Sequence, residues 1–281
     1  MRKIDWRAFA YTHKRLIAAA CAVCLTGAAL CALGGRGGTA ASATQAAQSG
    51  LPVINVGSDD YAPFNYTDVN GNSAGIDVEL AKEAFGRMGY QPEFHLIKWE
   101  DKQQLLANGT IDCVWGSFSM NGREDEYKWA GPYMQSYQVV AVNVDSDIYT
   151  FADLEGKTIA VQSTTKPEEI LRAGDSRIPQ VRKVLSVQKR ELIFTLLSKG
   201  YVDALAAHDT SVERFMSESG LKFRLLDEPL QTVGLGVAFY KDDTRGLDTR
   251  LNEIIKEMRA DGTVRKVLAK YMSDPDRYLE G

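Results

Sequence analysis

Short apolar runs alternate with amphipathic segments along the chain after residue 50. Runs rich in β-branched residues predict strands at 53–56, 93–97, 111–115, 159–161, 181–184, 202–205, 223–226 and 235–240. Apolar residues that recur every three or four positions predict helices at about 77–88, before 109, and at 167–172, 192–198, 211–217, 247–258 and 264–271. Strands that alternate with helices in this way form parallel sheets. We therefore expect an α/β fold with a parallel-sheet core.

One local pattern occurs twice in the chain. The segment Leu105–Asp112 reads Leu-Leu-x-x-Gly-x-Ile-Asp, and Leu196–Asp203 reads Leu-Leu-x-x-Gly-x-Val-Asp. Each combines a helix end, a glycine that stops the helix, and a strand with Asp after its first β-branched residue. The preceding elements also follow in the same order, which predicts two α/β lobes built to one plan. Coincidence between two ordinary helix–Gly–strand units is the alternative.

Polar or aromatic side chains follow four of the predicted strands. Parallel α/β sheets bind their ligands beyond the carboxyl ends of the strands. If the two lobes face each other, four such ends line one cleft, two from each lobe. These ends are Ser58–Tyr61, Ser117–Arg123, Ser163–Thr165 and His208–Asp209.

Arg123 is the cation in this group. Asn121, with Glu124 three residues later, matches a helix N-cap with its capping-box partner. Arg123 would then lie in the first helical turn, beside unpaired N–H groups that favour an anion. A guanidinium and nearby serine hydroxyls fit a carboxylate at this position. A surface turn with a solvated arginine is the alternative for this segment taken alone.

A second charge of opposite sign follows the last strand of the other predicted lobe. Asp209 there and Arg123 on the first lobe suit the two ends of a zwitterion such as an α-amino acid. Tyr61 and Trp99, both at strand ends, could sandwich the ligand side chain by stacking or by a cation–π contact. Core packing is the alternative role of each aromatic residue.

Charge and cysteine usage exclude several classes of partner. Residues 1–43 hold six Lys or Arg and one Asp, which leaves 27 basic and 36 acidic residues, or a net charge of −9. This balance argues against nucleic acid. Beyond the first 43 residues the sequence has a single cysteine, Cys113, in a predicted buried strand. We therefore expect no internal disulfide and no thiolate metal site. No metalloprotease helix, phosphate loop or dinucleotide fingerprint occurs, so we also expect no metal, cofactor or catalytic group.

The first 50 residues are typical of an export segment. A basic head precedes an apolar run without charges at 16–33, and Ala41–Ala43 offers small residues for cleavage. The run is also long enough for an uncleaved membrane anchor, and a lipid-modified cysteine is the least favoured alternative. In each case residues 51–281 are expected outside the cytoplasm, after an unfolded linker at 40–50.

Several short motifs occur in a characteristic order between 51 and 272. They are Tyr61–Phe64, Gly75–Ala81, Gly109–Asp112, the spacing from Arg123 to Pro132–Tyr133, Ser163–Thr165 and Asp261–Thr263. Together they resemble the family-3 bacterial extracellular solute-binding proteins, which serve polar amino acid uptake by ABC transporters. The resemblance implies a two-lobed periplasmic-binding-protein-like fold of type II, with a ligand cleft between the lobes.

The resemblance assigns a role to most of the candidate residues. It implies that Tyr61 and Trp99 stack on the ligand. It implies that Arg123, with Ser119 and Thr165, holds the ligand carboxylate. The complete set of implied ligand-binding residues is Ser58, Tyr61, Trp99, Ser117, Ser119, Arg123, Thr164, Thr165, His208 and Asp209.

Two neighbouring residues are alternatives at the ammonium end of the ligand. The resemblance places Ser117 and Asp209 there, and His208–Thr210 resembles glutamine-binding members. The preceding strand is one residue longer than usual, so His208 is the alternative to Asp209. The turn before Arg123 is one residue shorter. Ser58 stands where members that bind cationic side chains often carry Asp, which counts against lysine or arginine as the ligand.

The function implied by the resemblance is capture of an L-amino acid, polar and glutamine-like, by hinge closure. The monomeric protein would deliver it to the permease subunits of an ABC importer. The chain would cross between lobes near 133–137 and 232–236, which gives a first lobe of 51–133 and 237–281 and a second lobe of 138–231. The alternatives are a cyclohexadienyl-type dehydratase on the same scaffold, with Asp59, Asp60 or His208 as its acid, or a component of a ligand-sensing receptor. Which amino acid binds is left open.

Overall fold

The computed structural model of the protein describes residues 50–280. The predicted export segment lies almost entirely outside this range. Within the range, no helix is long and apolar enough to cross a membrane.

One group of elements, called the first lobe below, surrounds a parallel three-stranded core. The strands are β1 (Val53–Ser58), β4 (Gln91–Leu96) and β5 (Cys113–Ser119), with the short hairpin of β2 (Tyr66–Thr67) and β3 (Ser73–Ala74). The helices are α1 (Ile76–Arg87), α2 (Lys102–Ala107), α6 (Leu247–Ala260) and α7 (Thr263–Leu268), with short 3-10 turns at Trp99–Asp101 and Asp276–Tyr278.

The second lobe repeats this arrangement around three further parallel strands. They are β7 (Thr158–Gln162), β8 (Lys183–Val187) and β9 (Ala204–His208). The helices are α3 (Lys166–Ala173), α4 (Glu191–Ser198) and α5 (Asp209–Ser219), with a 3-10 turn at Phe151–Leu154 and the short strand β10 (Phe223–Leu225).

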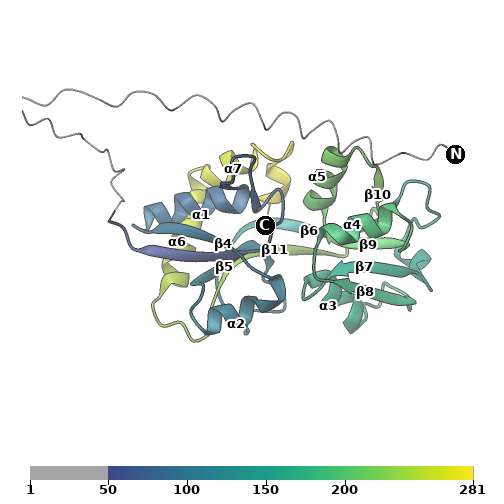
Figure 1. The fold of residues 1–281 in the computed structure, drawn as a ribbon, viewed down its shortest axis with the longest axis horizontal. Helices are drawn as coiled ribbons and strands as arrows, with labels where there is room; N and C mark the ends of the chain where they lie inside the picture. Colours follow the sequence, from purple (N-terminus) through teal and green to yellow (C-terminus); the bar gives the residue numbers. More distant parts are fainter. Residues whose placement is uncertain (1–49, 281) are drawn as a thin grey trace, which may run out of the picture. The chain divides into compact units, whose positions relative to one another are not determined.

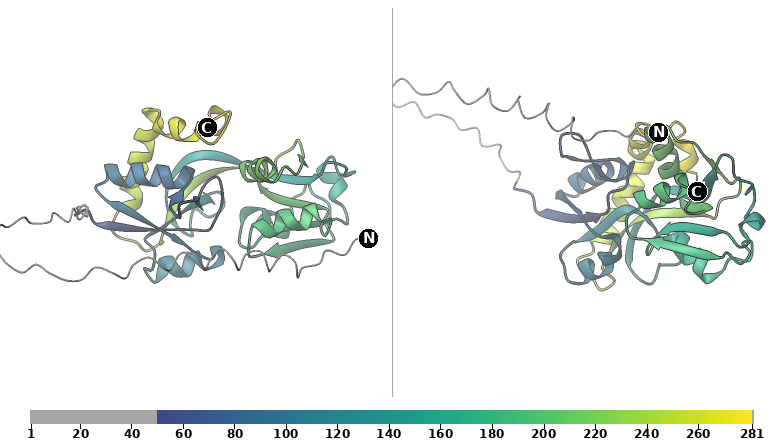
Figure 2. Two further views of the ribbon diagram at one scale, coloured as in Figure 1. Left: turned by 45° about the horizontal axis from the view of Figure 1, so that its top comes forward. Right: turned by 45° about the vertical axis from the view of Figure 1, so that its right-hand side comes forward.

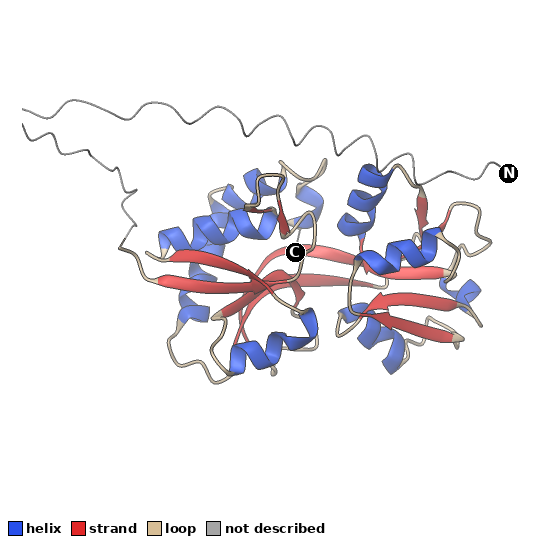
Figure 3. Cartoon of the chain, in the orientation of Figure 1, coloured by secondary structure: helices blue, strands red, loops and turns tan. Residues whose placement is uncertain are grey.

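Two long antiparallel strands join the lobes into one sheet. They are β6 (Lys128–Asn143) and β11 (Gln231–Phe239), and the strand order is β4-β1-β5-β11-β6-β9-β7-β8, with β10 on β6. Both run between the two groups of helices (Figures 1 and 2), and helices flank the strands of each lobe (Figure 3). The predicted α/β class with parallel cores is therefore confirmed. The predicted residue boundaries of the lobes stay a prediction.

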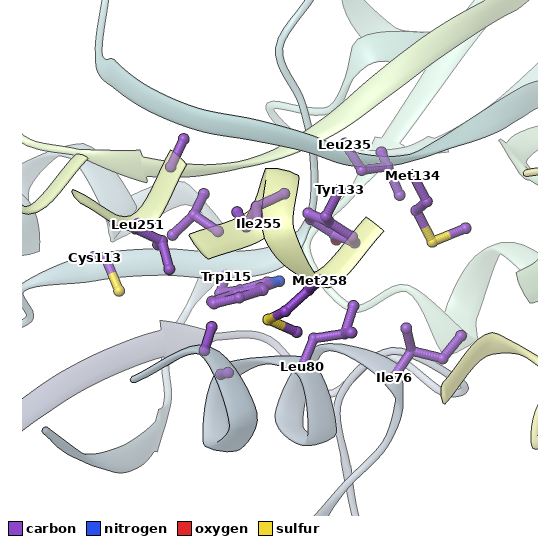
Figure 4. Packing of buried hydrophobic residues seen from close by; sticks show 14 of the residues in the cluster. Ile76, Leu80, Cys113, Trp115, Tyr133, Met134, Leu235, Leu251, Ile255 and Met258 are labelled. Atoms are coloured by element: carbon purple, nitrogen blue, oxygen red, sulfur yellow. The ribbon is translucent and has the colours of Figure 1, made fainter. Parts of the chain in front are cut away.

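Separate hydrophobic clusters stabilise the two lobes. In the first lobe, Trp115 of β5 lies near Met258 of α6 and Leu80 of α1 in one cluster (Figure 4). Cys113 is free and fully buried, as the apolar run around it predicted. β6 contributes Tyr133 to this cluster and Val139 to a cluster of the second lobe, so one strand belongs to both cores.

The repeated sequence pattern corresponds to a repeated set of hydrogen bonds. Asp112 accepts a bond from the backbone N–H of Asn55 at 2.7 Å, and Asp203 accepts one from Thr158 N–H at 2.7 Å. In both copies the aspartate directly precedes one strand, β5 or β9, and binds the backbone of the neighbouring parallel strand, β1 or β7. Both helix stops have left-handed glycines, with φ of 73° and 70°. The prediction of two units built to one plan is therefore confirmed at this level.

Candidate functional site

A small cavity lies where the carboxyl ends of β5, β7 and β9 meet. Six of the ten predicted ligand-binding residues line it, three from strand β5 or the turn after it. These six are Trp99, Ser117, Ser119, Arg123, Thr165 and His208. The cavity is also lined by polar residues that the sequence did not single out, namely Gln138, Gln162, Lys166 and Arg190.

The turn that carries Arg123 is not a helix, so the predicted capping box is wrong. Asn121 accepts a hydrogen bond from the backbone N–H of Gly234 at 2.9 Å, and Glu124 accepts one from Gly122 at 3.0 Å. The polar side chains therefore bind the turn and strand β11 instead of a first helical turn. β6 begins at Lys128, which leaves no length for a helix.

The Arg123 side chain is nevertheless buried at the cavity, with 8% of its surface exposed. Its Nη1 donates to the Ser119 carbonyl at 3.3 Å, and its guanidinium lies over the Phe118 ring at 5.3 Å. Nη2 forms an ion pair at 3.0 Å with Glu169 of α3, which also pairs with Lys166. A carboxylate from the second lobe is thus already bound by Arg123, which shows that the guanidinium is accessible to one.

Tyr61 stacks on a protein side chain in this structure. The guanidinium carbon of Arg190 lies 3.1 Å from the centre of the Tyr61 ring. Arg190 also pairs with Asp59 at 3.0 Å, and Gln162 donates to the same carboxylate oxygen at 2.9 Å. Burial raises the pKa of Tyr61 to about 12, so its hydroxyl stays protonated. The predicted stacking platform exists, but Tyr61 lies beneath Arg190 and does not line the cavity.

Arg190 was not predicted because the end of the strand expected at 181–184 was not among the strand ends taken to line the cleft. β8 ends at Val187, and Arg190 follows three residues later. Since β8 lies parallel to β7, its carboxyl end meets the same edge of the sheet. The strand-end rule applied to every strand would have found this residue.

A buried lysine lies behind the cavity wall. The Nζ atom of Lys102 donates to the Trp99 carbonyl at 3.1 Å and to the Thr164 hydroxyl at 3.1 Å, and lies 4.8 Å from the Trp99 ring centre. Burial, followed by the positive charge of Arg123, lowers the pKa of Lys102 to about 8. Thr164 thus binds Lys102 and does not line the cavity. Ser58 does not line it either, and its hydroxyl donates to the Asp59 carbonyl at 2.8 Å.

The structure corrects the prediction that Asp209 faces the cleft. Asp209 is the first residue of α5, and its carboxylate accepts a hydrogen bond from Tyr278 at 3.1 Å and lies 3.5 Å from Arg277. It is 1% exposed and does not line the cavity. His208, the alternative, does line it. Successive side chains at a strand end point to opposite sides, so a shift of one residue exchanges their roles.

His208 lines the cavity as a neutral ring, and each of its two ring nitrogens has a hydrogen-bond partner. Its Nδ1 lies 2.7 Å from Ser136 Oγ, and its Nε2 accepts from the Gln138 amide at 2.9 Å. Burial, followed by the charge of Arg190, lowers the pKa of His208 to about 3. The ring therefore offers no charge to a ligand at neutral pH.

Several buried polar atoms around the cavity have no hydrogen-bond partner among the described residues. They are Ser117 Oγ, Gln138 Oε1, Gln162 Oε1, Asp59 Oδ1 and Arg190 Nε. Buried polar atoms are normally satisfied, so each indicates a missing donor or acceptor. Ser117 and Thr164 also hold left-handed backbone, with φ of 50° and 57°. Strain of this kind clusters at functional sites.

Comparison with known proteins gives one consistent group of relatives. The profile described as "Bacterial extracellular solute-binding proteins, family 3" matches residues 54–274. The histidine-binding periplasmic protein of Salmonella typhimurium is 30% identical over 241 residues, 82% of this chain and 92% of that protein. The glutamate-binding protein GluB of Corynebacterium glutamicum is 26% identical over 81% of both chains.

Solved structures agree with the sequence comparisons. A substrate-binding protein of an amino acid ABC transporter is similar with a TM-score of 0.71 and 29% identity, covering 79% of this chain and 99% of that one. An ancestral amino acid-binding protein described as a precursor of cyclohexadienyl dehydratase has a TM-score of 0.70 and 27% identity, covering 78% and 95%. Both pairs of proteins share the fold over most of their length.

Proposed function

Because this chain belongs to the bacterial extracellular solute-binding proteins of family 3, we propose that it captures a free L-amino acid outside the cytoplasm for an ABC importer. Permease subunits in the membrane would receive the amino acid from it. The relatives named above differ in ligand, histidine in one and glutamate in another. Similarity alone therefore does not select the side chain that this protein binds.

The observation that carries the proposal is the buried Arg123 at the cavity, already paired with a carboxylate. The partner, Glu169, has a side chain that is 44% exposed, so it can leave the guanidinium at low cost. The carboxylate of an amino acid would replace it and accept further bonds from Ser119 and Thr165, which line the same cavity. Bidentate binding of this kind explains why an arginine is placed here.

The ammonium end would bind unsatisfied acceptors in the wall of the same cavity. Ser117 Oγ, Gln138 Oε1 and Gln162 Oε1 are buried without a partner among the described residues, and all three side chains line the cavity. An ammonium carries three N–H donors, which matches three acceptors. Neutral oxygens would thus replace Asp209 in the role expected from the sequence.

We propose that capture uses hinge closure about β6 and β11. The two strands connect the lobes, and Ser119 and Arg123 belong to the first lobe, while Thr165 and His208 belong to the second. A ligand that docks on the first lobe would be enclosed when the second lobe closes. Export by the leader and a monomeric state are further parts of this proposal.

The geometry gives little support to a dehydratase. Such an enzyme needs a general acid at the reacting group. His208 is neutral with a pKa of about 3, and Asp59 is held by Arg190 and Gln162. Asp60, whose pKa burial raises, is exposed and does not line the cavity. We therefore propose binding without turnover.

A thermal-shift screen of the purified protein against the twenty amino acids tests the proposal. A ligand at one hundred times its Kd stabilises a protein by about 2.7 kcal/mol. For a chain of this size that corresponds to a rise in Tm of roughly 5–10 °C. The absence of a shift with every amino acid, at millimolar concentrations, would rule the proposal out.

A further inference from the structure

The charged residues that line the cavity all have the same sign. Arg123, Lys166 and Arg190 line it, with exposures of 8%, 6% and 7%, and no Asp or Glu of residues 50–280 does. Burial of like charges is unfavourable unless opposite charges compensate them. Carboxylates outside the cavity therefore have to compensate part of this charge.

Two carboxylates reach these cations from outside the cavity. Glu169 pairs with both Arg123 and Lys166, and Asp59 pairs with Arg190. Within residues 50–280, Lys102, 6% exposed, donates hydrogen bonds only to neutral oxygens, those of Trp99 and Thr164. Among residues 50–280, these four buried cations have only two carboxylates in direct ion pairs, so the cations exceed their directly paired carboxylates by two. Glu100 and Glu126 act on Lys102, and Glu124 on Lys166, without an ion pair.

Arg190 is the cation best prepared to bind a ligand. Its guanidinium is fixed between the Tyr61 ring, 3.1 Å away, and Asp59, which binds Nη2. Its Nε is buried and has no partner within residues 50–280. A guanidinium held in place with one free N–H is preorganised for an acceptor that approaches from the cavity.

We propose that the ligand is an acidic amino acid, and that Arg190 binds its side-chain carboxylate while Arg123 binds its α-carboxylate. This inference rests on the proposed function and names the ligand class of the same cavity. A neutral amino acid brings no net charge and leaves the excess unchanged. A cationic one increases it. An acidic one reduces it by one, and its second carboxylate accepts a charge-assisted bond at Arg190.

The test compares two ligands of nearly the same shape. Calorimetry at pH 7 measures L-glutamate, L-aspartate and L-glutamine on the purified protein, with the other amino acids that shift Tm. We expect the better of the two acidic ligands to bind at least tenfold more tightly than glutamine. A neutral or cationic amino acid that binds more tightly than both acidic ones overturns the inference and leaves the proposed function intact. If no amino acid binds, the proposed function itself fails.

A substitution tests the role of Arg190. Arg190→Gln should weaken the acidic ligand at least tenfold and change the affinity for glutamine less than threefold, so that discrimination between them is lost. Equal weakening of both ligands would mean that Arg190 only joins the lobes, and would overturn its assignment. Lys189→Gln is the matched control, since Lys189 is an exposed neighbouring cation. It should leave both affinities within twofold, and a cooperative thermal transition confirms that each variant is folded.

Discussion

β5 and β9 occupy equivalent places in the two lobes, but the segments that follow them differ. Both strands are preceded by the same unit, Leu-Leu-x-x-Gly-x followed by a β-branched residue and Asp, and this aspartate accepts a hydrogen bond at 2.7 Å from the neighbouring strand. β5 continues into a tight turn that brings Arg123 to the cavity. β9 ends at His208, and α5 begins at once with Asp209. The scaffold is repeated, whereas the chemistry at its end is not.

The difference determines where each lobe directs its charge. Arg123 pairs with Glu169, whose side chain is 44% exposed and can be replaced by a ligand. Asp209, 1% exposed, is bound by Tyr278 and Arg277 on the side away from the cavity. In the proposed function the first lobe therefore offers its strand-end charge to a ligand, whereas the second lobe uses its own to fix the C-terminal segment.

The largest effect on ligand affinity is expected when these two charges are removed one at a time. Arg123→Ala removes the partner of the carboxylate of the bound amino acid. This costs about 2–5 kcal/mol of binding free energy, or roughly tens-fold to thousands-fold in affinity. Asp209→Asn should change affinity less than about threefold. Calorimetry with the amino acid that gives the largest thermal shift measures both. Equal losses in the two variants would contradict the comparison. Lys256→Ala, an exposed cation on α6, is the control.

A smaller effect is expected from the two scaffold aspartates. Asp112 accepts bonds from both nitrogens of Asn55 and pairs with Arg245 at 2.5 Å. Asp203 accepts from Thr158, and its nearest cation, Arg182, is 3.7 Å away. Asp112→Asn should therefore lower the free energy of unfolding by about 1.5–3 kcal/mol and Asp203→Asn by about 0.5–1.5 kcal/mol. Urea denaturation measures both, and a larger loss for Asp203→Asn would show that the two copies are not energetically ranked by these contacts.

The smallest effect concerns the titration of His208, which has no titratable counterpart at the equivalent position of β5, Ser117. The pKa of His208 is about 3 in the folded protein, below its ordinary value of 6.5. Between these values the unfolded chain binds a proton that the folded chain does not, so stability falls as pH falls. At pH 5.5 the loss is about 1.4 kcal/mol. His208→Gln should abolish this contribution in urea denaturation between pH 7.5 and 5.5. An unchanged pH slope would place the effect elsewhere.

The elements were largely predictable because strands and helices here bury regular apolar patterns. β6 is the exception: its 16 residues contain Gly131, Pro132 and Ser136, which interrupt the apolar run that would have identified a strand. The position of Arg123 followed from the strand-end rule. The pairing of Arg190 with Tyr61 and Asp59 did not, since such contacts join residues more than 100 positions apart.

The repeated sequence pattern itself indicates that His208, and not Asp209, faces the cavity. His208 lies five residues after Asp203, and Ser117 lies five residues after Asp112; both line the cavity. Asp209 corresponds in the same way to Phe118, whose ring packs in a hydrophobic cluster and also lines the cavity. Counting from the repeated aspartate therefore gives His208 the position of a polar cavity residue and Asp209 that of an apolar one, whereas local resemblance to other proteins favoured Asp209. Register within a strand pair decides which side chain faces a ligand.

The sharing of β6 between two hydrophobic cores has a consequence for how the protein denatures. Its first half places Tyr133 in one core, and its second half places Val139 in another. If one lobe unfolds, this strand loses its hydrogen-bonded neighbours in that lobe, and the sheet of the other lobe is left with unpaired backbone groups at its edge. Heat should therefore disrupt both cores in a single cooperative event, so that the two lobes, whose relative motion the proposed function requires, are not free to unfold separately.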